Sequence, residues 1–244
     1  LEGMQKPYVL MGDLLKRQPR DIVFNLCQYG MGDVWKWGAQ VGGHSWRTGG
    51  DLGFELERIF EIAIKNCGLR DYNKPGGFND PYYLQIGWHG AQRGGTFELS
   101  QPCPLTPNEQ YSFMSLWCLM AAPLFYSGDI QKLDAFTLGI LCNHELIEIN
   151  QDPLGQCAKI VKQDGDGFVM VKDLEDGGKA IGLCNQARWP QPMRVAWADA
   201  GVTGSQAVRD SWRQQDLGSF TEGYEAVVPP RFVLVLRLAP PARP

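Results

Sequence analysis

The feature that most constrains the fold is a change in sequence pattern near residues 150–155. Before it, short apolar runs alternate with amphipathic stretches of helical period, and polar, glycine-rich segments follow the apolar runs. After it, short alternating runs are separated by the turn sequences 164–167 and 176–178. The pattern predicts an α/β domain over residues 1–155 and a small antiparallel β-sandwich over residues 156–244.

The first half contains only about four strand–helix units. A closed eight-stranded α/β barrel needs twice that number, over roughly 250 residues. The chain therefore predicts either a smaller α/β fold or half of a barrel. Strands are expected at 22–26, 45–48, 76–81 and 124–127, and helices at 7–18, 34–41, 54–66, 109–122 and 132–141. In the second half we expect strands at 159–162, 167–173, 179–185, 193–197 and 231–238.

Charge and composition exclude several classes of partner. The net charge of −4 and the pI near 5.4 give no electrostatic footprint for nucleic acid or an anionic membrane surface. The longest apolar window, 116–126, is too short to span a membrane. The seven cysteines form no C-x-x-C pair, so zinc is not expected, and the redox compartment stays open. Cys118, Cys142 and Cys184 are interpreted as small core residues.

The N-terminal residues predict no signal peptide and no targeting segment. The chain lacks an initiator methionine and enters a helical pattern directly from Leu1. We therefore expect that it begins within a longer protein.

The segment 45–52, Ser-Trp-Arg-Thr-Gly-Gly-Asp-Leu, places an arginine and a carboxylate four residues apart. On a helix, Arg47 and Asp51 would be an ordinary surface pair. Adjacent glycines each destabilise a helix interior by about 1 kcal/mol, so a strand end that opens into a loop fits better. Loops of that kind build the active site of α/β barrels, and the segment is therefore a candidate site.

Several segments, taken together, resemble one family. Residues 24–30 (Phe-Asn-Leu-Cys-Gln-Tyr-Gly), 45–51 and 76–81 (Gly-Gly-Phe-Asn-Asp-Pro) resemble three successive loops of the family 27 glycoside hydrolases, the α-galactosidase and α-N-acetylgalactosaminidase group. Segments 119–124, 149–155, 208–212 and 216–218 are similar to the same family in the same order. The resemblance implies the second half of a (β/α)₈ TIM barrel, strands five to eight, over residues 1–155, followed by the β-sandwich.

The resemblance also implies a retaining mechanism, with two carboxylates about 5–5.5 Å apart. The family's acid/base aspartate follows its arginine by four residues, which corresponds to Asp51. Its nucleophile lies in a Lys-x-Asp motif at the end of strand four, and no such motif at a strand end precedes Cys27. The chain is therefore expected to carry the acid/base and part of the sugar pocket, to lack the nucleophile, and to be inactive without the N-terminal half of the barrel.

Each candidate residue has a structural alternative. Asp51 is also a favoured N-cap for the helix expected at 54–66. Arg47, which the resemblance makes a donor to the sugar C2 hydroxyl, is alternatively an ion-pair partner of Asp51 or Asp80. Cys27 is either a core residue or part of the pocket wall. Gln28 and Tyr29 stand where the family often has Glu and Trp, and a bulky Tyr29 favours galactose over N-acetylgalactosamine.

Tyr82 and Tyr83 stand where the family usually has Asp and Met. Tyr82 is taken as a substrate-binding residue, although the replaced aspartate removes one acceptor from the pocket. Either another residue replaces that acceptor, or the substrate differs from plain galactose. Asn79 and Asp80 are either supports behind the pocket or parts of a loop turn.

Three hypotheses follow from these residues. The first is hydrolysis of terminal α-galactosides. The second is a related glycosidase, namely an α-N-acetylgalactosaminidase, a β-L-arabinopyranosidase or an isomaltodextranase-like enzyme. The third is a non-catalytic carbohydrate-binding or structural remnant. The resemblance implies no cofactor and no metal, and it implies a secreted, periplasmic or lysosomal-type location.

Overall fold

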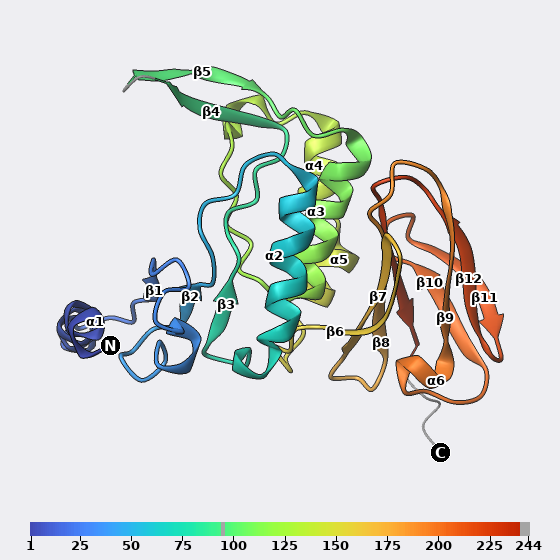
Figure 1. The fold of residues 1–244 in the computed structure, drawn as a ribbon, viewed down its shortest axis with the longest axis horizontal. Coiled ribbons are helices and arrows are strands. Elements are labelled where there is room, and N and C mark those ends of the chain that lie inside the picture. The colour runs from blue at the N-terminus through green and yellow to red at the C-terminus, as the bar shows by residue number, and fades with distance from the viewer. Residues whose placement is uncertain (94–95, 240–244) are drawn as a thin grey trace.

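The computed structural model describes residues 1–93 and 96–239. Two parts lie side by side: helices around a short parallel sheet, and a layered assembly of antiparallel strands (Figure 1). The helical part holds the N-terminus and the sandwich holds the C-terminal strands. The main apolar core joins them, because α2, α3 and the inner face of the sandwich sheet contribute to one continuous cluster.

The parallel sheet has the strand order β1-β2-β3. β1 (Asn25–Leu26), β2 (Ser45–Arg47) and β3 (Phe78–Asp80) fall inside the predicted ranges and pair in register, with Arg47 opposite Asp80. The strand expected at 124–127 appears only as a single parallel bridge between Leu84 and Tyr126. Pro123, which has no N–H to donate, directly precedes that segment.

The helices largely follow the predicted periodicity. Four expected helices are present as α1 (Glu2–Lys16), α2 (Leu56–Gly68), α3 (Pro107–Leu119) and α4 (Ala135–Leu141). The helix expected at 34–41 is only a 3₁₀ turn, Val34–Lys36, and Gly38 packs tightly against the Trp46 ring just beyond it. Two further 3₁₀ turns cover Arg70–Tyr72 and Ile130–Lys132.

One helix was not expected. α5 (His144–Asn150) is preceded by its N-cap Asn143, whose side chain accepts hydrogen bonds from the backbone N–H groups of Glu145 and Leu146. Such a cap stabilises a helix start, although the gap of only two residues after α4, Cys142 and Asn143, conceals that start in the apolar periodicity. The sequence signal was therefore the asparagine itself.

A two-stranded hairpin of β4 (Trp88–Arg93) and β5 (Thr96–Pro102) was not expected either. It leaves the helical part at the top of Figure 1, after the chain has passed through β3. Its base is attached to the helical part: the His89 ring stacks on Phe54 at 4.3 Å, and Lys132 Nζ lies 4.6 Å from the centre of the Trp88 ring.

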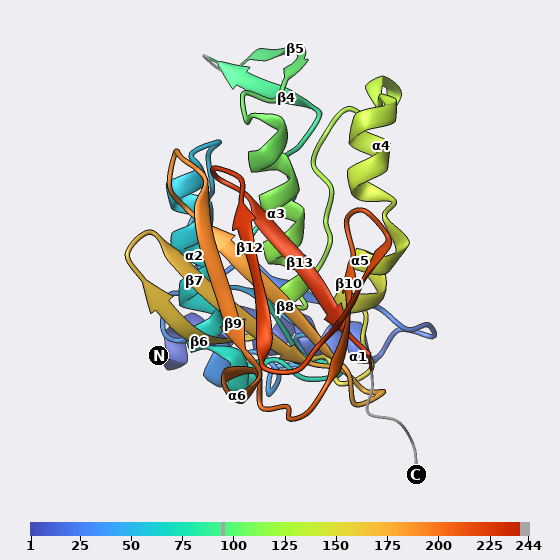
Figure 2. The ribbon, with the colours of Figure 1, turned by 90° about the vertical axis from the view of Figure 1, so that its right-hand side faces the viewer.

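The second half forms an antiparallel sandwich. A six-stranded sheet has the order β11 (Gln215–Phe220), β10 (Gln206–Asp210), β13 (Val233–Leu238), β8 (Lys179–Asn185), β7 (Gly167–Asp173) and β6 (Lys159–Asp164). β12 (Gly223–Val228) pairs with β9 (Gln191–Ala196), and the short helix α6 (Trp197–Ala200) follows β9. Figure 2 shows this side of the molecule.

Turn chemistry predicted part of the sandwich. The segments 164–167 and 176–178 lie in the hairpin connections between β6 and β7 and between β7 and β8. β10, β11 and β12 were missed because residues 206–228 carry few apolar side chains, and most of β11 and β12 is exposed or half-buried. Cys118 and Cys184 are buried as expected, but Cys142 is exposed, and the core interpretation was wrong for it.

The sandwich is attached to the helical part by fixed polar contacts. Lys172 of β7, only 1% exposed, donates from Nζ to the carbonyl oxygens of Ile149 and Cys118 at the C-terminal ends of α5 and α3. A cation is favoured there because helix C-termini carry partial negative charge. A second contact joins Arg209 of β10 to Glu145 of α5 through three hydrogen bonds of 2.7–3.1 Å.

Lys172→Met should destabilise the fold at pH 7 by about 1–3 kcal/mol, because the Ile149 carbonyl then loses its buried donor. The loss should be larger at high pH. Burial lowers the pKa of Lys172 to about 8, so between pH 8 and 10.5 the unfolded chain binds more protons than the folded one, and the wild type gains stability with pH.

Urea unfolding of both proteins at pH 7 and pH 9.5 measures this difference, with Lys162→Met, an exposed lysine of β6, as the control. A difference between wild type and Lys172→Met that does not change with pH would contradict the assigned burial of the charge.

Candidate active site

The carboxyl ends of β1, β2 and β3 bring the predicted site residues to one edge of the parallel sheet. Cys27, Gln28 and Tyr29 follow β1, the Arg47–Asp51 segment ends β2, and Tyr82 follows β3. The order of the strands therefore places residues more than fifty positions apart in one cluster, at the end of the strands where α/β barrels carry their active sites.

Arg47 lies at the centre of this cluster. Its side chain is 5% exposed, and Nη2 donates to the Gly49 carbonyl at 3.0 Å and to Asp51 Oδ1 at 3.3 Å. Its guanidinium carbon lies 4.3 Å from the centre of the Tyr82 ring and 5.2 Å from that of the Tyr29 ring. Arginine binds aromatic faces well because its charge is planar and weakly hydrated. Both rings therefore lie within cation–π distance of the guanidinium.

Asp51 differs from Arg47 in exposure, since 67% of its side chain is open to solvent. It does not cap α2: the N-cap is Glu55, and the helix begins at Leu56. The capping interpretation is therefore wrong, and the ion pair with Arg47 is present. The Asp51 carboxylate is therefore accessible to a ligand, while its ion pair with the buried Arg47 holds it in place from one side.

Tyr29 adopts a left-handed backbone conformation, with φ of 56°, which is uncommon for a bulky residue. A hydrogen bond with the Cys27 side chain is the main cause that raises the pKa of Tyr29. Cys27 is exposed, so the core interpretation is wrong for it, whereas Gln28 is buried. The three residues after β1 thus turn sharply and present a thiol and a phenol side by side.

Tyr82 has ring neighbours besides Arg47. The Tyr83 ring lies 5.0 Å from it, and Phe125 lies 6.4 Å from Tyr83 in an edge-to-face arrangement. Burial is the main cause that raises the pKa of Tyr82, with a further contribution from the charge of Asp51. Tyr82 is therefore packed among neighbours, while Tyr83 keeps a large exposed surface.

A buried polar layer supports the site from below. Asn25 Nδ2 donates to Asp80 Oδ2 and to Ser45 Oγ, both at 2.8 Å, and so joins all three strands. Burial raises the pKa of Asp80, against the hydrogen bond from Asn25 and the charge of Arg47, which lower it. Asp80 is therefore a buried support; it does not belong to an exposed turn.

The sequence patterns did not predict that Asn25, Thr48 and the end of α2 belong to this support. The Thr48 hydroxyl donates to Asn66 Oδ1 at 3.0 Å, and Lys65 Nζ donates to the Thr48 carbonyl at 2.6 Å. The available signal was the polar Asn25 inside the apolar run 22–26. A polar residue in a short, partly buried strand requires partners, and here they are Ser45 and Asp80 of the two neighbouring strands.

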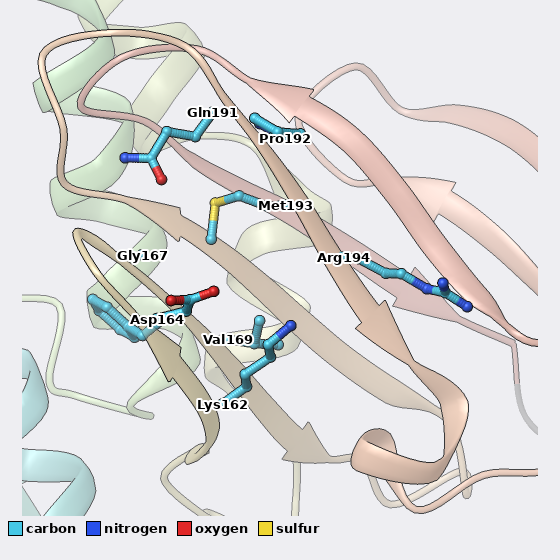
Figure 3. Close-up of a pocket in the computed structure, with 9 residues that line it drawn as sticks. Lys162, Asp164, Gly167, Val169, Gln191, Pro192, Met193 and Arg194 are labelled. Atoms are coloured by element: carbon cyan, nitrogen blue, oxygen red, sulfur yellow. The ribbon is translucent and has the colours of Figure 1, made fainter.

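Several hollows lie elsewhere among the described residues. One, in the sandwich, is lined by Lys162 and Asp164 of β6 and Gln191–Arg194 of β9 (Figure 3). Its volume of about 70 Å³ has room for a few water molecules but not for a sugar ring. Another, of about 620 Å³, is mainly apolar and is lined by residues that include Val23, Phe78, Leu124 and Phe125. The first hollow is thus too small to rival the strand-end cluster as a sugar site.

Within residues 1–93 and 96–239, no helix is long and apolar enough to cross a membrane. The same described residues contain no group of three or more His, Cys, Asp or Glu side chains placed to hold a metal ion.

Comparison with known proteins matches both halves of the chain. A family model described as "Alpha galactosidase A" matches residues 2–152, and one described as "Alpha galactosidase C-terminal beta sandwich domain" matches residues 164–238. A "Probable alpha-galactosidase" of Dictyostelium discoideum is 33% identical over 98% of this chain, and alpha-galactosidase 3 of Arabidopsis thaliana is 34% identical over 91%.

The crystal structure of alpha-galactosidase I from Mortierella vinacea has the same fold, with a TM-score of 0.86 at 23% identity, covering 96% of this chain and 62% of that one. The chain spans 60% of the length of the Dictyostelium relative and 48% of the Arabidopsis relative. The similarity therefore extends over nearly all of this chain but over only about half of the length of its relatives.

Asn25→Ala should destabilise the protein by about 2 kcal/mol, because it removes a donor from the buried Asp80 carboxylate. The free energy of unfolding in urea measures the loss. In an Asp80→Ala background the same substitution should be less than half as damaging, since the carboxylate that needs the donor is gone. Equal losses in the two backgrounds would show that Asn25 does not act through Asp80.

Proposed function

The chain belongs to the α-galactosidase family, family 27 of the glycoside hydrolases, and from this premise we propose that it hydrolyses terminal α-galactosides with retention of anomeric configuration. The observation that carries the proposal is the contact of the buried Arg47 with the exposed Asp51 at the end of β2. It combines a rigid donor with an accessible carboxylate at a strand end.

Asp51 is the proposed acid/base. In a retaining mechanism one carboxylic acid protonates the leaving oxygen, and its carboxylate then removes a proton from the attacking water. The large exposure of Asp51 suits both steps, because a leaving group and a water molecule must each reach it. Arg47 is the proposed donor to the sugar C2 hydroxyl, for which a planar guanidinium held between two rings is well suited.

The proposed pocket wall consists of Cys27, Gln28, Tyr29 and Tyr82. The half-buried and exposed tyrosines offer apolar surface to the carbon face of a sugar. Gln28 offers an uncharged amide as donor and acceptor. The bulk of Tyr29 beside Arg47 leaves little room for a substituent larger than a hydroxyl at C2.

We further propose that residues 1–155 form strands five to eight of a (β/α)₈ barrel and that residues 156–244 form its sandwich domain. Exposed apolar side chains on α1, among them Leu10 and Met11, support this division, as does the apolar hollow beside β3. Such surfaces mark contacts with another protein segment. That segment is the first half of the barrel, which supplies the nucleophile; without it the chain is expected to be inactive.

A second candidate is a related glycosidase, and one observation favours it. Tyr82 occupies the position where the family usually has an aspartate, and its ring is engaged with Arg47. A β-L-arabinopyranoside resembles an α-galactoside without its C6 hydroxymethyl group, so it needs fewer hydrogen-bond acceptors in the pocket. Aryl glycosides of both sugars separate the two candidates in one assay.

Asp51→Asn in the full-length protein should lower kcat on 4-nitrophenyl α-galactoside by about 10²–10⁴-fold, the usual contribution of general acid–base catalysis. The rate of the first step, in which the leaving group departs, should fall less with 2,4-dinitrophenyl α-galactoside, because that leaving group needs no proton. Asp199→Asn, an exposed aspartate on α6, is the control.

A wild-type full-length protein that releases nitrophenol from no aryl glycoside would overturn the proposed function. An Asp51→Asn variant that retains the wild-type rate would remove Asp51 from the mechanism.

Tyr29→Ala should raise kcat/KM for 4-nitrophenyl α-N-acetylgalactosaminide relative to the α-galactoside by about tenfold, because it opens space beside the C2 position. Steady-state kinetics on both substrates test this. An unchanged ratio would mean that another residue excludes the N-acetyl group.

A further inference from the structure

Arg47 and Asp80 each keep one buried polar atom without a hydrogen-bond partner. On Arg47 it is Nε, while Nη2 is bonded to Gly49 and Asp51. On Asp80, which is 1% exposed, it is Oδ1, while Oδ2 accepts from Asn25. One of the unpaired atoms is a donor and the other an acceptor. Buried polar groups are nearly always paired, so both atoms require an explanation.

The two residues are direct neighbours across the sheet. Arg47 and Asp80 are register partners on the parallel strands β2 and β3, so their side chains leave the same face. The charge of Arg47 also lowers the pKa of Asp80, against its burial. The unpaired donor and the unpaired acceptor thus belong to oppositely charged groups at adjacent positions.

The environment of Arg47 permits a shift toward Asp80. Tyr82 and Tyr29 contact the guanidinium through their rings, at 4.3 and 5.2 Å. Contact with a ring face fixes the plane of the cation but imposes no single hydrogen-bond direction within that plane. Within the described residues, Nη2 is held in its present orientation by its hydrogen bonds to the Gly49 carbonyl and to the exposed Asp51. A ligand that engages Asp51 competes with one of them.

We propose that Arg47 exchanges carboxylate partners during the reaction: as the sugar enters, its Nε turns onto Asp80 Oδ1 and Asp51 is released. Asp80 is then a positioning residue, and the proposal rests on the proposed function of Asp51 as acid/base. The exchange has a chemical reason. A general acid must carry a proton, whereas an arginine in contact with a carboxylate favours the form without one.

The proton balance is simple. Arg47 stays protonated throughout. Asp51 gives its proton to the leaving oxygen and later takes one from the attacking water. Asp80 gives and takes none; it provides the buried negative charge that holds Arg47 away from Asp51 while these transfers occur.

The test uses the full-length protein with Asp80→Asn, Arg47→Lys and the double variant. Asp80→Asn keeps the side-chain shape and removes the charge, while Arg47→Lys keeps the charge and removes the Nε donor. The measurement is the pH dependence of kcat and kcat/KM on 4-nitrophenyl α-galactoside, whose alkaline limb reports the general acid.

Asp80→Asn should lower kcat at least tenfold, change KM less than threefold, and move the alkaline limb to lower pH by about one unit, because Arg47 then stays on Asp51. In the Arg47→Lys background it should lower kcat by less than threefold. Trp46→Phe is the structural control, since Trp46 points away from Arg47 and donates to Asn79. It should lower the melting temperature and leave the pH profile unchanged.

Two results, each with an active wild type, would overturn the exchange and leave Asp80 as a structural support. One is an alkaline limb that Asp80→Asn does not move. The other is a kcat that falls additively when Asp80→Asn and Arg47→Lys are combined. A wild type that hydrolyses none of the aryl glycosides would overturn the proposed function, and the exchange with it.

Discussion

The parallel pairing of β1, β2 and β3 is the constraint on which the site depends. In-register pairing sets Arg47 beside Asp80, and the alternation of side chains along a strand puts Asn25, Ser45, Arg47 and Asp80 on one face. Trp46, Leu26 and Asn79 alternate with them, and Trp46 packs in a separate apolar cluster. A slip of one residue would exchange the two sets and place the arginine among apolar side chains.

The sandwich contributes to this arrangement indirectly. Lys172 binds the C-terminal ends of α3 and α5, and Arg231 pairs with Glu57 at the start of α2 and with Glu109 at the start of α3. The same helix α2 supplies Asn66 and Lys65 to Thr48, the residue after Arg47. The strand-end loops therefore rest on a helix that is fixed at one end by the second half of the chain.

Much of this architecture could be predicted from the sequence. Apolar periodicity located α2 and α3, and aspartate–glycine turns located the hairpins of β6, β7 and β8, because both signals are local. The predictions that were wrong or absent concern elements whose structure is decided by tertiary packing. The helix expected at 34–41 shrinks to one turn, and polar strands such as β11 were missed because their pairing, not their composition, makes them strands. At the site, Arg47 and Asp51 were recognisable, but the stacking of Tyr82 on Arg47 was not, since it depends on the distance between two strand ends.

The short length of β1 has a consequence for how the chain behaves in solution. Among the described residues β1 pairs on one side only, with β2, so its other edge can accept a further strand. Open edges are where unrelated chains join and aggregate. With only Asn25 and Leu26 in the ladder, however, an intruding strand gains few hydrogen bonds. The brevity that makes this sheet hard to recognise in a sequence also makes it a poor template for indiscriminate pairing, and it favours a partner that brings side-chain complementarity of its own.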